Sequence, residues 1–342
     1  MSLLPLFNNN QPTLSPSNNF FLNKTLKRNI LFGFFAILII SSITINLYHF
    51  INCYLEDTSE YFLLDNNNNN SNDNKENLNY LSQNFLPNVS YPKLKDLIIV
   101  TGHAIYLGEN EENWILEDYQ KGNGQVNTFI KHIKKGVELV KENEESLLIF
   151  SGGETRPSAG PRSEAQSYYA LAQSLNLLSS TINSTAQTTT STTQYPLITR
   201  IITEEYARDS YENLLFSICR FNEYTNNYPR NITVIGFQFK KKRFLELHRF
   251  ALKFPLNRFN YIGIDPDNSS PLGRFVNENV NSLGPFKQDL YGCHGKLLDK
   301  KLTRNPYRRS HPYQISCPEL SLLFNYCPKN QSQLYPDILP WG

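Results

Sequence analysis

The feature that most restricts the fold is a series of short, β-branched apolar runs that alternate with amphipathic segments. Five such runs lie at residues 97–101, 147–151, 198–203, 232–236 and 261–264. Short runs that are rich in β-branched residues and bounded by Gly or Pro are typical of strands buried on both faces. They predict five strands of one sheet.

Helical patterns lie between these runs. From Val126 to Val140, apolar residues recur every three or four positions and form one stripe. Further helices are expected at 163–178, 210–224 and 241–254. Strand–helix–strand alternation favours right-handed crossovers and a parallel sheet. The expected fold is therefore α/β, a Rossmann-like three-layer sandwich with a mainly parallel sheet, over residues 91–270.

A second constraint is the run from Ile30 to Ile51, 22 residues without Asp, Glu, Lys or Arg. At about 1.5 Å per residue it reaches about 33 Å, enough for a hydrocarbon core of about 30 Å. A cleaved signal peptide has a shorter apolar region, of about 7–15 residues, and a small-residue cleavage pattern, which is absent here. A buried core helix would show a polar face. The run predicts one N-terminal transmembrane helix that acts as a signal anchor.

The charges on either side of this run predict its orientation. Basic residues and no acids precede it, whereas six acids and Lys75 follow it before residue 91. Positive charge favours the cytoplasmic side. We expect a cytoplasmic tail at 1–29, an Asn-rich disordered stalk at 52–90 and a lumenal or extracellular C-terminal domain. The chain would be a single-pass type II membrane protein of the endomembrane system or the cell surface. Five sequons are compatible with a glycoprotein: Asn88, Asn183, Asn231, Asn268 and Asn330.

Two further segments complete the organisation. A Ser/Thr-rich insertion at 179–194 separates the second helix from the third strand. Residues 271–342 form a C-terminal extension, expected to pack on the domain, with Cys293, Cys317 and Cys327. Two of these could pair in an oxidising compartment, and without a CxxC pair no zinc site is expected. The net charge of +2 argues against a nucleic-acid partner.

In open parallel sheets, ligands bind outside the carboxyl ends of the strands. The run Ser151-Gly152-Gly153 follows the second strand and lets a ligand approach the backbone closely. Its amides, with Glu154 and Arg156 after them, would suit a phosphate or carboxylate; the alternative is a plain turn. Ser163 and Gln166 have capping-box spacing.

The other strand ends add polar groups, each with a structural alternative. Glu204 ends the third strand, and Ser210 and Asn213 share a face of the helix that follows. Asp209 or Ser210 could be only an N-cap, and Arg208 could pair with a neighbouring acid. Lys240 and Arg243 lie near a helix start, where a bound anion would offset their charge, although a solvated basic run fits as well. His103 could be an acid–base group or a structural histidine, and His248 and Cys219 have core spacing.

The ordered set of loops resembles the YdcF-like family, which includes SanA and ElyC and is a domain of unknown function. The residues that match are Gly102, the run 151–153, Ser163-Glu164-Ala165, Glu204, Glu212-Asn213 and Arg243. Three positions depart: Lys240 replaces the family's His, Ala207 its Ser and Ser210 its Thr. The resemblance covers roughly residues 95–265. It implies a Rossmann-like fold, a polar pocket at the strand ends and, by analogy, a nucleoside ligand such as S-adenosylmethionine.

These residues suggest an enzyme that acts on a small phosphate-bearing or nucleotide-like molecule, such as a glycan or lipid-carrier intermediate. A binding module for such a ligand and a scaffold with a decayed pocket are the alternatives. Glu204 or Glu164 would be a general base or a ligand for a divalent cation, and His103 an acid–base group. The expected ligand-binding residues are Gly102, Ser151, Gly152, Gly153, Glu154, Arg156, Arg208, Ser210, Asn213, Lys240 and Arg243.

Overall fold

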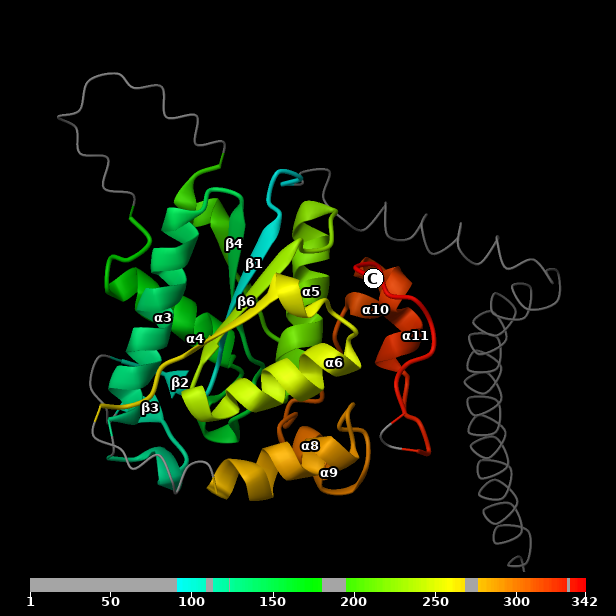
Figure 1. Cartoon of the computed structure of the whole chain (residues 1–342). Coiled ribbons are helices and arrows are strands. Elements are labelled where there is room, and N and C mark those ends of the chain that lie inside the picture. Colours follow the sequence, from blue (N-terminus) through cyan, green and yellow to red (C-terminus); the bar gives the residue numbers. More distant parts are fainter. Residues whose placement is uncertain (1–90, 109–112, 123, 180–194, 268–275, 331–332) are drawn as a thin grey trace, which may run out of the picture. The chain divides into compact units, whose positions relative to one another are not determined.

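The computed structural model describes residues 91–342 except 109–112, 123, 180–194, 268–275 and 331–332 (Figure 1). The described residues belong to one compact unit, Lys75–Gly342. The predicted tail, transmembrane helix and stalk, and almost all of the Ser/Thr-rich insertion, lie outside the described residues. Within the described part of the chain, no helix is long and apolar enough to span a bilayer.

A five-stranded parallel sheet forms the centre of this unit (Figure 1). The spatial order is β5-β4-β1-β6-β7, so the central strand β1 pairs with β4 on one side and with β6 on the other. All five predicted strands are confirmed. Their bounds are Asp96–Thr101 (β1), Ser146–Ser151 (β4), Ile201–Glu204 (β5), Asn231–Gly236 (β6) and Phe259–Gly263 (β7).

The third predicted run is the one that the structure shortens. It begins as a 3-10 turn, η4 (Leu197–Arg200), and only then becomes β5. Pro196 precedes this turn, and its carbonyl accepts a hydrogen bond from Thr199 N at 3.0 Å. Proline fixes φ near the helical value, and it therefore favours a turn at this point over an extended strand.

Helices cover both faces of the sheet. Alternate residues of β1 enter separate cores: Leu97 and Ile99 pack with α5, and Ile98 and Val100 with α3 and α4. This alternation is what a strand buried on both faces requires. The four predicted helices are present as α3 (Gln125–Glu142), α4 (Glu164–Ser174), α5 (Ser210–Thr225) and a helix made of η6 (Arg243–His248) and α6 (Arg249–Ala251).

Side-chain caps fix where two of these helices begin. Ser163 accepts a hydrogen bond from Gln166 N at 2.9 Å at the start of α4. Asp209, rather than Ser210, caps α5 and accepts from Glu212 N at 2.8 Å. Such caps satisfy amides that have no partner within the helix. Ser210, as the first helical residue, therefore keeps its hydroxyl for another contact.

The helix after β6 opens with a π-helical turn, η6. Arg249 N bonds to Phe244 O, five residues back, in place of four. Residues five apart therefore share a face, which brings Arg243 and His248 to the same side. A second π-helical turn, η8 (Asn279–Leu283), occurs in the C-terminal part. Such turns are rare and are frequent at functional sites.

The C-terminal residues pack on the α5 face. Tyr313, Leu320 and Trp341 belong to the same core as Phe216 of α5. A disulfide joins Cys293 to Cys327, whereas Cys219 and Cys317 are buried free thiols. The elements of this region are α8 (Gly284–Gln288), α9 (Gly295–Thr303), α10 (Tyr313–Ser316), η9 (Pro318–Leu320) and α11 (Ser321–Phe324).

The remaining elements are short. A two-stranded antiparallel ribbon, not predicted from the sequence, pairs Ile105 with Ile115 and Tyr106 with Trp114. Its strands have only two residues each, too few for an alternating pattern to be visible. These elements are β2 (Ile105–Tyr106), β3 (Trp114–Ile115), η2 (Asp118–Gln120), η3 (Pro157–Ala159), η5 (Gln238–Lys240) and η7 (Leu256–Arg258).

Candidate functional site

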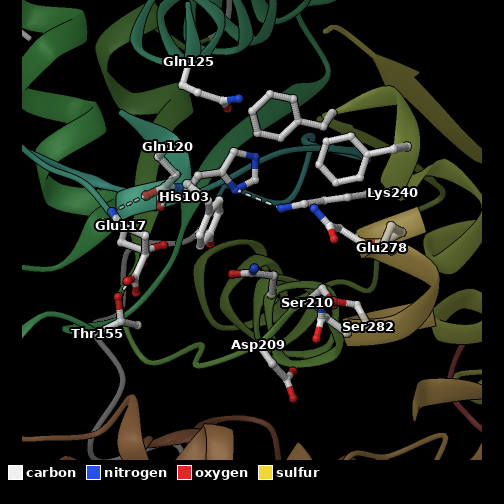
Figure 2. Close-up of a pocket in the computed structure, with 18 of the residues that line it drawn as sticks. His103, Glu117, Gln120, Gln125, Thr155, Asp209, Ser210, Lys240, Glu278 and Ser282 are labelled. Atoms are coloured by element: carbon white, nitrogen blue, oxygen red, sulfur yellow. Dashed lines mark hydrogen bonds between the residues drawn. The ribbon is translucent and has the colours of Figure 1, made fainter. Parts of the chain in front are cut away.

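A cavity of about 1430 Å³ lies at the carboxyl ends of the strands. Every strand of the sheet contributes to the wall close to its end: Gly102 after β1, Thr155 after β4, Ser210 after β5, Lys240 after β6 and Asp267 after β7. Residues that are far apart in the sequence thus line the same cavity (Figure 2). This is the place where ligands bind in open parallel sheets.

The cavity includes the point where the strand order reverses, between β1 and β6. His103 follows β1 and Lys240 follows β6, and Lys240 Nζ lies 3.2 Å from His103 Nδ1 (Figure 2). Burial, and then the charge of Lys240, lowers the pKa of His103 well below its ordinary value. His103 is therefore a neutral imidazole at pH 7, stacked on Phe237 with ring centroids 4.9 Å apart. Its Nε2 is buried and has no hydrogen-bond partner in the described structure.

Four cations around the cavity have no carboxylate at ion-pair distance among the described residues: Lys240, Lys296, Lys300 and Arg304. Burial, and then the neighbouring Arg243, lowers the pKa of Lys240 to about 7. Burial, and then Arg304, lowers the pKa of Lys300 to about 8. Cations that lower each other's pKa would be stabilised by an anion between them.

The other predicted cations are already paired. Arg208 makes two bonds to the Glu212 carboxylate, at 2.9 and 2.6 Å. Arg156 pairs with Glu117. Arg243 pairs with Glu278 at 2.9 Å, and each side chain is only 5% exposed. Each of these three arginines lines the cavity with its charge largely offset.

The run Ser151-Gly152-Gly153 has a different role from the one expected. Gly152 N donates to Glu204 O at 3.0 Å, and Gly153 N donates to Ala207 O at 2.8 Å. The expectation of free amides was therefore wrong for both glycines. A Cβ on Gly152, where φ is +155°, would lie 2.8 Å from the Glu164 carboxylate. The run thus joins β4 to the β5–α5 loop and to α4, and it does not line the cavity. Glu154 does not line the cavity either, and it pairs with Arg309.

Glu204 lies behind the cavity wall. Its carboxylate accepts bonds from Ser151 Oγ at 2.7 Å and from Tyr206 N at 2.7 Å, and burial raises its pKa to about 7. Ser151 Oγ also lies 2.8 Å from Asn213 Oδ1, and Asn213 lines the cavity. Glu204 can therefore act only through its neighbours. Of the two predicted carboxylates, Glu164 alone lines the cavity, where it accepts a bond from the Thr155 hydroxyl.

A contact that the sequence did not indicate lies on the wall made by α5. Ser210 Oγ lies 2.8 Å from His248 Nε2. Ser210 was expected to bind a ligand, whereas His248 was interpreted as a packing residue because its spacing is that of a core residue. The π-helical turn, which no sequence pattern revealed, places this histidine against Ser210.

The C-terminal extension supplies part of the site, which was also not predicted. Glu278, Lys300 and Arg304 line the cavity together with the strand ends. The only signal in the sequence for Lys300 and Arg304 was the basic stretch 296–309, which has no fixed relation to the sheet, and Glu278 had none. Elsewhere in the extension, Cys293, His294 and Cys327 are close enough together to bind a metal, but the disulfide occupies both sulfur atoms.

No model of a known protein family matches the chain. Over 276 residues the chain is 33% identical to "Uncharacterized protein YOR238W" of Saccharomyces cerevisiae. The similarity covers 66% of this chain and 88% of the yeast protein.

Proposed function

This chain belongs to the family of the uncharacterized yeast protein YOR238W, and we propose that it is a YdcF-like enzyme that acts on a small phosphate-bearing or nucleotide-like molecule. The observation that carries the proposal is the convergence of Lys240, Lys300 and Arg304 on one cavity without carboxylate partners. Phosphate groups are the ligands that such cation clusters bind most strongly.

The arrangement of the strands supports the YdcF-like and Rossmann-like part of the proposal. In chain order, the five parallel strands are arranged 3-2-1-4-5, with helices on both faces. That is the order of doubly wound nucleotide-binding sheets. The positions that carry the resemblance, among them Gly102, Glu164, Asn213 and Arg243, lie together around the strand ends.

Acid–base groups in the cavity support an enzyme. Lys240, with its pKa near 7, can give or take a proton at neutral pH, and His103 beside it is neutral. Groups tuned in this way are effective acid–base catalysts. A binding module is the second candidate, since Glu204 lies outside the cavity and Glu164 is already bonded by Thr155. Release of inorganic phosphate from a bound ligand would distinguish the two.

Lys300→Met should weaken the binding of a phosphate-bearing ligand by about tenfold or more, because one charge-assisted hydrogen bond contributes about 1.5–3 kcal/mol. The full-length chain in detergent would be screened by thermal unfolding against nucleotides, nucleotide sugars, S-adenosylmethionine and divalent cations. A ligand at 100 times its dissociation constant adds about 2.7 kcal/mol to the free energy of unfolding, which raises the unfolding temperature by about 5–10 °C.

Lys141→Met is the matched control, because Lys141 is an exposed lysine in the last turn of α3, away from the cavity. It should leave the shift unchanged. If Lys300→Met and Arg304→Met retain the full shift as well, the cations are not the binding site and the proposal is wrong.

The apolar run from Ile30 to Ile51 supports an anchor with the domain in the lumen or outside the cell. The disulfide Cys293–Cys327 also supports this side of the membrane, because disulfides persist in oxidising compartments. The chain contains five cysteines. In protein denatured directly from cells and not reduced, a thiol reagent should react with all of them except the two in the disulfide, Cys293 and Cys327. Reaction of all five without reduction would place the domain in the cytosol.

A further inference from the structure

The wall formed by α5 carries a hydroxyl and an imidazole in the arrangement of a nucleophile and its base. Ser210 Oγ lies 2.8 Å from His248 Nε2, and Ser210 lines the cavity while His248 is fully buried behind it. A serine becomes an effective nucleophile when a neutral histidine accepts its proton. The contact lies within the range for such pairs.

The surroundings of His248 keep it neutral. Phe244 and Phe286 contact its ring nearly at right angles, with centroids 5.2 and 4.6 Å away. Burial, followed by the charges of Arg243 and Lys301, lowers its pKa well below the ordinary value. A neutral imidazole can accept a proton at neutral pH, whereas a protonated one cannot.

The position of Ser210 favours negative charge on its oxygen. It is the first residue of α5, a helix of 16 residues, and the N-terminus of a helix carries a partial positive charge. Lys240, Arg243 and Lys300 line the same cavity. Figure 2 shows Asp209, the preceding residue, pointing away from His103 and Lys240, and its carboxylate lies 3.3 Å from Lys301 Nζ.

We propose that Ser210 is the nucleophile of this site and His248 its general base, and that the substrate is a phosphate monoester or a phosphoanhydride. This inference rests on the proposed function, since it needs a phosphoryl group in the cavity. It names the residue that forms the covalent bond to phosphorus. Neither the pattern of residues at the strand ends nor the carboxylates of Glu164 and Glu204 supply such a nucleophile.

In the first step, Ser210 Oγ forms a bond to phosphorus and its proton passes to His248 Nε2, while Nδ1 keeps its own proton. The bond from phosphorus to the leaving oxygen breaks, and that oxygen keeps the electron pair and takes a proton from Lys240. In the second step, water attacks the phosphoserine and gives one proton to Lys240. The bond from phosphorus to Ser210 Oγ breaks, that oxygen keeps the electron pair and takes the proton back from His248, and phosphate leaves. The sum is hydrolysis, and no other reactant is needed.

The test is covalent labelling of the full-length chain in detergent with an alkyl fluorophosphonate. Ser210 Oγ would bond to phosphorus, fluoride would leave with its electron pair, and the proton would pass to His248. Peptide mass analysis should find the label on Ser210. Ser282 is an internal control, because it lines the same cavity and no described hydrogen bond joins it to a histidine. Inorganic phosphate should slow labelling in proportion to its occupancy of the site.

Two variants separate the roles. His248→Gln should slow labelling by about 100-fold, since a positioned base contributes about 10²–10⁴-fold, and Ser210→Ala should abolish it. The variants His248→Gln and Ser210→Ala should still bind inorganic phosphate. Ser210→Thr keeps a hydroxyl and is the control for a folding defect. Phosphate binding without labelling at Ser210 in the unmodified chain would overturn the nucleophile but not the proposed function. Absence of phosphate binding in that chain would overturn both.

Discussion

Arg243→Met should destabilise the fold by about 3–5 kcal/mol, the usual cost of removing one partner of a buried ion pair. Arg243 and Glu278 are each 5% exposed and lie 2.9 Å apart. Without the guanidinium, Glu278 would be a buried carboxylate with no cation at ion-pair distance among the described residues. Urea unfolding of the full-length chain can be followed by the fluorescence of Trp114 and Trp341, which are both buried.

The same helix offers a matched control. Lys242 pairs with Glu246 at 3.7 Å, and both side chains are more than half exposed. Lys242→Met should therefore cost less than about 1 kcal/mol. Replacing Arg243 and Glu278 together by Met should recover most of the lost stability, because neither partner is then left as an unpaired buried charge. A loss for Arg243→Met no greater than that for Lys242→Met would show that the pair is not buried in solution.

Anion affinity should fall by about 100-fold between about pH 6 and pH 9. The pKa of Lys240 is lowered to about 7 and that of Lys300 to about 8, so both are charged at the lower pH and neutral at the higher one. Each lost charge removes a charge-assisted bond of about 1.5–3 kcal/mol, partly offset because a bound anion raises both pKa values. Arg243, Arg304, Glu278 and Glu164 also act on the pKa of Lys240.

Sulfate is the probe for this measurement, because its charge does not change over the range, and calorimetric titration gives its affinity at each pH. The double variant Lys240→Arg and Lys300→Arg should bind sulfate with nearly constant affinity over this pH range, since a guanidinium stays protonated. If its pH dependence equals that of the unmodified chain, other groups control the affinity.

The sheet was predictable because each strand carries its own signal. β1 and β4 each have four consecutive apolar residues at their centre and are followed by glycine, and both bounds were predicted within one residue. The third strand was less exact, since the turn after Pro196 depends on local geometry that periodicity does not report. The ribbon of β2 and β3 is too short to produce any periodic pattern.

The candidate site was only partly predictable. Because parallel strands end at the same edge of a sheet, the residues that follow them were correctly predicted to share one cavity: Gly102, His103, Lys240 and Arg243. Position after a strand could not tell which groups face the cavity, so Glu204 was expected to act on a ligand directly. It also could not reveal His248, since a π-helical turn changes which residues share a face.

The C-terminal extension has a consequence for how this site could have arisen. Glu278, Lys300 and Arg304 come from the chain after the last strand, while Gly102 and Lys240 come from the sheet. The sheet supplies the place where a ligand binds, and the extension supplies much of the charge that selects it. A relative that kept the sheet and lost the extension would keep a pocket with a different preference. Ligand choice in this family can therefore diverge by changes outside the sheet, without any change at the strand ends.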